Sequence, residues 1–213
     1  MAGFADIYST LETLGSPAST LEYFSLVSTT SRAHIFIPFC DGSAPRLSCL
    51  KLRDCGISWE RPFWPLSKGL KYLEILNQAV YSRPKLTVWL DTLTEMSELR
   101  TLTLNQASPD APPFPFDIER SVTLPSLTNF NIVGHLEDFV LALAYLDLPA
   151  LTQLSLVAIC IRFPKSSDVQ ELLPYVSRYA YGIQHTQPLQ SILIRNNPKY
   201  VDLLAWPVAR YRR

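Results

Sequence analysis

The sequence predicts one α/β domain spanning residues 1–213, in which parallel strands stack in sequence order and helices or loops connect them on the opposite side. Two observations lead to this prediction. A short apolar motif, L-x-x-L-x-L, recurs along the chain, and segments with a helical spacing of apolar residues lie between its copies. A single repeat cannot bury its own apolar side, so we expect neighbouring copies to share one continuous core, as in a solenoid.

The motif is clearest in residues 46–59, RLSCLKLRDCGISW. From Leu47 onward this stretch meets every fixed position of the leucine-rich-repeat pattern L-x-x-L-x-L-x-x-N/C-x-L. Successive copies are separated by 26, 23, 29, 28, 24 and 38 residues, and all but the last spacing fall in the ~20–29 residues typical of such repeats. We therefore predict seven irregular repeats, which begin at Leu21, Leu47, Leu70, Leu99, Leu127, Leu151 and Leu189.

Each copy predicts one short strand, because alternate side chains of a strand point to opposite faces. The leucines would face inward and stack on the next repeat, and the residues between them would face outward on a concave surface. Burial of a leucine-sized side chain contributes about 1.5–3 kcal/mol, so a few per repeat supply a substantial stacking energy. The predicted strands lie near residues 21–26, 47–52, 70–75, 99–104, 127–132, 151–156 and 189–194.

The connecting segments predict helices and irregular loops on the convex side. Residues 85–98, 136–146 and 166–180 carry apolar side chains at helical spacing. Residues 4–14 show the same spacing and resemble the helix half of a preceding repeat. Residues 108–125 contain five prolines, so this segment is predicted to be a long loop.

The cysteines and histidines do not indicate a metal, redox or catalytic site. Cys55 occupies the N/C position of its repeat, which predicts a buried structural thiol, whereas Cys49 falls on an outward position of the same strand. The chain has no C-x-x-C pair and no histidine cluster near a cysteine, so we expect no metal site. His135 lies three residues before Asp138, but we expect His135 to fill the N/C position of its own repeat.

Motifs for catalysis and cofactor binding are absent from the sequence. There is no G-x-x-x-x-G-K, G-x-G-x-x-G, G-x-S-x-G or H-E-x-x-H pattern. We therefore expect no catalytic residue, no cofactor and no metal, and predict that the protein is not an enzyme. A hydrolase site built from loops around His135 and Asp138 is retained as an alternative.

Charge and hydropathy narrow the classes of partner. Lysine plus arginine equal aspartate plus glutamate at 19 each, which gives no basic surplus for nucleic acid or an anionic membrane. No apolar run approaches the ~18 residues of a membrane helix, and the first residues lack the pattern of a signal peptide. We expect an intracellular protein, cytoplasmic or nuclear, whose partner is another protein.

The outward positions of the predicted strands provide the candidate binding surface. Tyrosine and arginine are enriched at protein-binding hot spots, and both occur on the first three strands. The alternative is that these residues only form the solvated face of a parallel sheet. The candidate protein-binding residues are Tyr23, Lys51, Arg53, Tyr72, Glu74, Asn129 and Asn131.

The amino-acid sequences of the repeats resemble those of a known family. The stretches LSCLKLRDCGISW, GLKYLEI, LTEMSELRTLTLNQA and VTLPSLTNFNIVG are similar to F-box-like leucine-rich-repeat proteins of mushroom-forming fungi. The similarity covers roughly residues 5–207 and is not tied to a catalytic motif. The resemblance implies a right-handed horseshoe that recruits a protein substrate, with a separate N-terminal F-box that docks onto a cullin-type ubiquitin ligase.

The sequence departs from the family at its start. No helical segment with an L-P-x-E opening precedes the first repeat, so no ligase-docking residue is carried over. We expect a non-enzymatic protein-binding module, which would be the substrate-recognition part of a ubiquitin-ligase adaptor if an F-box exists upstream. The alternative is a truncated or stand-alone repeat protein without a ligase role.

Overall fold

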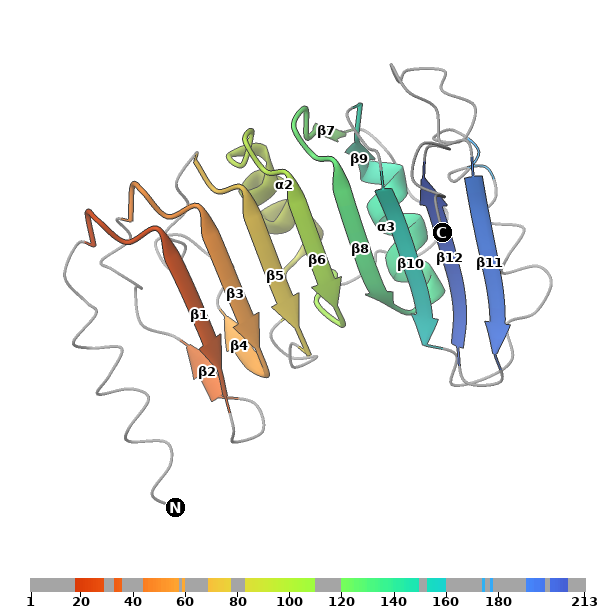
Figure 1. Cartoon of the computed structure of the whole chain (residues 1–213), viewed down its shortest axis with the longest axis horizontal. Helices are drawn as coiled ribbons and strands as arrows, with labels where there is room; N and C mark the ends of the chain where they lie inside the picture. The colour runs from red at the N-terminus through yellow and green to blue at the C-terminus, as the bar shows by residue number, and fades with distance from the viewer. Residues whose placement is uncertain are drawn as a thin grey trace, which may run out of the picture.

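One mixed β-sheet, most of whose strands are parallel, dominates the computed structural model (Figure 1). The structure describes residues 18–28, 33–35, 44–57, 59, 69–77, 83–109, 120–149, 153–159, 174, 177, 191–197 and 200–206. The sheet has eight strands in the order β1-β3-β5-β6-β8-β10-β12-β11. Their bounds are β1 Tyr23–Val27, β3 Cys49–Arg53, β5 Tyr72–Leu76, β6 Thr101–Asn105, β8 Asn129–Gly134, β10 Gln153–Ile159, β12 Tyr200–Trp206 and β11 Ser191–Asn197.

The first six strands of the sheet are parallel and follow the order of the sequence, so the α/β class is confirmed. Each of them begins two residues after the predicted start, because the first leucine of the motif closes a turn. The backbone N–H of Leu47 donates to the carbonyl oxygen of Ala44 at 3.0 Å, and Leu99 donates to Met96 at 3.1 Å. The strand then starts at the third residue of the motif.

The seventh predicted strand corresponds to β11, but it does not continue the parallel array. β12 lies between β10 and β11 and is antiparallel to both. Asn197 of β11 is the register partner of Tyr200 of β12, so only two residues separate the paired ends. A connection this short joins antiparallel strands, whereas a parallel pair needs a crossover of about a dozen residues. The prediction of a seventh stacked parallel strand is therefore wrong.

Two helices lie behind the sheet in Figure 1, α2 (Leu86–Thr94) and α3 (Leu136–Tyr145). They overlap two of the segments predicted to be helical. The predicted helix at 4–14 lies outside the described residues, and so does the helix at 166–180 apart from residues 174 and 177. Two-stranded parallel sheets flank the main one; they consist of β2 (Ala33–Ile35) with β4 (Cys55–Ile57), and β7 (Val122–Thr123) with β9 (Leu146–Asp147).

Strand β7 corrects the prediction of one loop over residues 108–125. Val122 pairs with Leu146 and Thr123 with Asp147 in parallel register. Val122 is also buried, so this end of the proline-containing segment joins the core. The prolines lie mostly before it in the chain, and the segment from Arg120 onward is free of them until Pro125. Pairing is possible there because each residue retains its backbone N–H.

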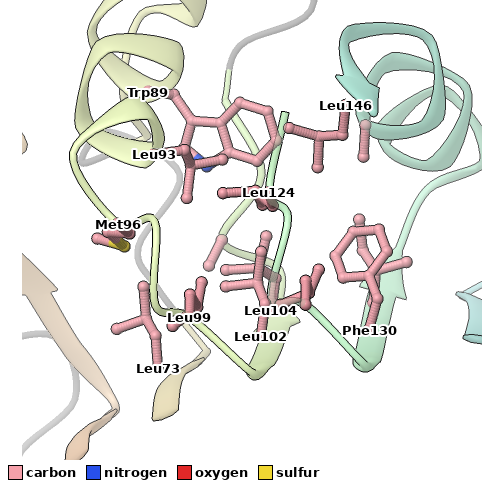
Figure 2. Close-up of a cluster of buried hydrophobic side chains, with 14 of the residues drawn as sticks. Leu73, Trp89, Leu93, Met96, Leu99, Leu102, Leu104, Leu124, Phe130 and Leu146 are labelled. Carbon is pink, nitrogen blue, oxygen red and sulfur yellow. The ribbon is translucent and has the colours of Figure 1, made fainter. Parts of the chain in front are cut away.

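The inward side chains of the parallel strands form one continuous core. Leu73 and Ile75 of β5, Leu102 and Leu104 of β6, and Phe130 of β8 are fully buried. Figure 2 shows that the side chains of α2 reach the same cluster from the other side, with Trp89 and Leu93 above the strand residues. The motif therefore places its second and third leucines in the core, and α2 covers them. The residues labelled in the figure are Leu73, Trp89, Leu93, Met96, Leu99, Leu102, Leu104, Leu124, Phe130 and Leu146.

Equivalent backbone hydrogen bonds join neighbouring strands just before each strand begins and just after it ends. At the strand ends, the N–H of Asp54 donates to Leu76 at 3.0 Å, and the N–H of Asn77 donates to Asn105 at 2.8 Å. Asp54, Asn77 and Gln106 all have positive φ, of 56°, 57° and 53°. This conformation is unfavourable for most side chains, but it turns each strand out of the sheet at the same level.

Two neighbouring aliphatic residues of β5 point to opposite faces and differ in burial, which gives a direct test of the core. Ile75 has an exposed fraction of 0%, whereas Leu76 is only half-buried on the other face. We expect Ile75→Ala to lower the free energy of unfolding by about 2–5 kcal/mol, because it leaves a cavity. Leu76→Ala removes a similar number of atoms and should cost less than about 1 kcal/mol. Urea unfolding of both variants measures the difference, and equal losses would contradict the assigned faces.

Candidate protein-binding surface

The face of the sheet turned away from the helices, called the outer face below, carries the alternate residues of each parallel strand. Because the strands are in register, these residues line up in rows that cross the sheet. The first row is Tyr23, Cys49, Tyr72, Thr101, Asn129 and Gln153, and the second is Ser25, Lys51, Glu74, Thr103, Asn131 and Ser155. The third row is Val27, Arg53, Leu76, Asn105, Val133 and Val157.

Lys51 lies between two tyrosine rings. Its Nζ is 4.9 Å from the centroid of the Tyr72 ring and 6.0 Å from that of Tyr23. The register produces this arrangement, because Tyr23 and Tyr72 are the partners of Cys49 on either side, and the small Cys49 leaves room between the rings. Each cation–π contact at an exposed site contributes about 0.5–1 kcal/mol. The two rings therefore restrict where the ammonium group can lie.

Glu74 and Tyr72 form a second fixed pair on strand β5. The Tyr72 hydroxyl donates to Glu74 Oε2 at 2.7 Å. Partial burial, followed by the hydrogen bond to Glu74 and the charge of its carboxylate, raises the pKa of Tyr72 from 10.0 to about 12. The Tyr72 hydroxyl therefore keeps its proton, and its hydrogen bond to Glu74, to a higher pH than an ordinary tyrosine would.

Arg53 stands at the end of β3 between two apolar residues. Its register partners are Val27, which is 53% exposed, and Leu76, which is half-buried. Arg53 itself is exposed, and no ion pair joins it to any residue that the structure describes. The other large exposed apolar side chain in the described part of the chain is Tyr23, at 55%. This corner of the outer face thus combines cations with accessible apolar surface.

On β6, β8 and β10 the three rows carry only neutral side chains, and amide hydrogen bonds join some of them. Asn131 Nδ2 donates to Thr103 Oγ1 at 3.3 Å, across the β6–β8 pair. Asn129 Nδ2 donates to Thr128 Oγ1 at 3.0 Å and approaches Thr101 Oγ1 at 3.5 Å. The amide groups are therefore partly engaged within the sheet.

The two described cysteines differ in position, as the motif predicts. Cys55 is 1% exposed, and its thiol donates to the carbonyl oxygen of Arg53 at 3.0 Å. Cys49 is half-buried on the outer face. Burial raises the pKa of both thiols above the usual value, which further lowers the fraction of nucleophilic thiolate at neutral pH. The burial predicted for Cys55 is confirmed.

His135 and Asp138 serve a structural purpose at the start of α3. The backbone N–H of His135 donates to Asp138 Oδ2 at 2.7 Å, and Arg83 Nη1 lies 3.3 Å from Asp138 Oδ1. Burial raises the pKa of Asp138 despite these two favourable contacts. His135 is exposed and lies at the ninth position of its repeat motif, where the chain leaves β8. β8 leads directly into α3 at this point, so His135 is the residue that precedes the helix.

All seven residues predicted from the sequence lie on the outer face. The structure brings Tyr23, Lys51, Tyr72 and Glu74 together, with Arg53 beside them, and separates Asn129 and Asn131 from this group by strand β6. Val27 and Leu76 share a row with Arg53 but were not predicted, because apolar residues directly after the motif give no sign that they face outward. The two-residue shift of the strands places them in the third row. Their role in binding stays a prediction.

Comparisons with known proteins identify no relative. The chain matches no protein-family model, and no curated protein and no solved structure is significantly similar to it. In the described part of the chain, neither helix has the length and apolar character needed to cross a membrane. No group of three or more histidine, cysteine, aspartate or glutamate side chains there is arranged to hold a metal ion.

The Tyr72–Glu74 pair can be tested by titration. Ultraviolet titration of the wild type minus Tyr72→Phe should isolate one tyrosine with a pKa of about 12. Glu74→Gln removes the carboxylate, so we expect the Tyr72 pKa to fall. It should stay above 10.0 because burial is the largest cause of the shift. A Tyr72 pKa that is unchanged in Glu74→Gln would contradict the observed pairing.

Proposed function

We propose that the chain is a non-enzymatic protein-binding module of the leucine-rich-repeat type, and that it binds its partner through the outer face. Six parallel strands in sequence order support a repeat solenoid, since each repeat supplies one strand and buries the same motif leucines. The observation that carries the proposal is the cluster around Lys51. Tyrosine, arginine and exposed aliphatic side chains gather there on a face that neither described helix covers (Figure 1).

The composition of the cluster fits a protein partner. Protein interfaces combine aromatic and arginine anchors with a polar rim, and the outer face has its anchors on β1, β3 and β5 and neutral amides beyond them. The cation–π contacts and the Tyr72–Glu74 hydrogen bond also reduce the side-chain entropy that binding would have to remove.

The family resemblance extends the proposal to a ubiquitin-ligase assembly. F-box-like repeat proteins recruit substrates to a ubiquitin ligase, and the repeats of this chain resemble theirs. We propose the same substrate-recognition role for an intracellular form of the protein that carries an F-box upstream. For a form without an F-box, we propose a stand-alone repeat protein that binds through the same face.

A photo-crosslinking amino acid at Ser25, an exposed position of the outer face, tests the binding surface in the cells that produce the protein. The matched control position is Thr87, which is exposed on α2 behind the sheet. We expect discrete protein adducts from position 25 that are lost on Lys51→Gln and are absent from position 87. Equal adducts from both positions, or none from position 25, would contradict the proposal. Mass spectrometry of the adducts shows whether ligase subunits accompany the partner.

A further inference from the structure

We infer that the outer face recognises an acidic segment of its protein partner, with two carboxylates that pair with Lys51 and Arg53 and apolar residues next to them. This inference deepens the proposed function and rests on it. Three observations support it: the spacing of the two cations, the lack of an ion pair at either one among the described residues, and the apolar surface on either side.

Lys51 and Arg53 point to the same face of strand β3, because they are two residues apart. Successive residues of a strand advance by about 3.2–3.4 Å, so the two Cα atoms are roughly 6.5–7 Å apart. An extended peptide has the same repeat. Carboxylates at positions i and i+2 of an extended segment running along β3 would therefore match the two cations.

Both cations lack an ion pair among the residues that the structure describes. Glu74, the register partner of Lys51, accepts the Tyr72 hydroxyl at 2.7 Å, and Lys51 lies over the tyrosine rings. Asp54, which follows Arg53, accepts a hydrogen bond from Asn77 Nδ2 at 3.0 Å. Glu74 and Asp54 thus accept hydrogen bonds from neutral side chains and form no ion pair with Lys51 or Arg53, so both cations can still pair with a carboxylate of a partner. A carboxylate binds both more strongly than a neutral amide, because charge-assisted hydrogen bonds are shorter and stronger.

The surroundings of the two cations specify the rest of the segment. Tyr23 and Val27 are 55% and 53% exposed, and they lie along β1 beside Lys51 and Arg53. Leu76 borders Arg53 on the other side. An apolar side chain adjacent to the carboxylates would cover these groups and exclude water from the ion pairs, which strengthens them. The uncharged rows on β6, β8 and β10 would contact neutral parts of the partner.

Fluorescence anisotropy with the full chain tests the inference. The probe is a dye-labelled peptide with two glutamates separated by one serine and flanked by leucines, and the comparison peptide has glutamines in place of the glutamates. We expect the glutamate peptide to bind about tenfold more tightly at low salt, with the difference shrinking as salt screens the charges. Equal affinity of the two peptides, or no binding of either, would overturn the inference.

Variants separate the two cations from general positive charge. Lys51→Gln and Arg53→Gln should each weaken binding of the glutamate peptide about three- to tenfold, without changing the affinity of the glutamine peptide. The matched control is Lys71→Gln, which removes an exposed lysine that precedes β5 and lies outside the three rows. A loss for Lys71→Gln as large as that for Lys51→Gln would show nonspecific attraction and contradict the inference.

The two proposals fail in different ways. Crosslinking from position 25 without any preference for the glutamate peptide would leave the binding face intact and refute the acidic partner. Absence of crosslinking from position 25 would refute the binding face itself. A peptide with phosphoserine in place of both glutamates provides one further arm. Strong binding of this peptide without a preference for glutamate over glutamine would show that the face selects phosphate, which would overturn the inference.

Discussion

In-register stacking of parallel strands is the constraint on which the rest of this structure depends. Leu73, Leu102 and Phe130 are register partners across β5, β6 and β8, and each has an exposed fraction of 0%. The stacking buries one apolar row per strand position and satisfies the backbone groups between neighbouring repeats. A shift of one residue in any strand would turn its leucines outward, so hydrophobic burial fixes the register strongly.

The same register assembles the candidate binding surface. Tyr23, Cys49 and Tyr72 are separated by more than twenty residues along the chain, yet the pairing of β1, β3 and β5 places them in one row. Lys51 then lies between the two rings, and Arg53 falls between Val27 and Leu76. No local feature of the chain would hold these side chains together, so the surface is a consequence of the core on the other side of the sheet. This connection explains how a sheet of short parallel strands presents a defined cluster of charge and apolar surface.

Much of this architecture was predictable, since the spacing of leucines encodes both the strands and their inward faces. The outward positions of Lys51 and Tyr72 followed from the same alternation. The interactions of these residues did not, because the cation–π contacts and the Tyr72–Glu74 bond depend on side-chain conformations across neighbouring strands. The order of β11 and β12 was also missed. Apolar spacing alone does not distinguish a further repeat from a hairpin, and only the two-residue separation of Asn197 and Tyr200 indicates the antiparallel pairing. The place of His135 directly before α3 was also not predictable, because the motif does not show where a helix replaces the turn.

The most direct test of the account is a set of nuclear Overhauser effects between side chains of β5, β6 and β8. With selectively labelled methyl groups and phenylalanine rings, the account predicts contacts from Leu102 to Leu73 on one side and to Phe130 on the other. These contacts would establish the parallel register that orients the outer face. Absence of both contacts, or contacts from Leu102 to the outer-face residue Leu76, would contradict the register, and with it the placement of Lys51 and Arg53.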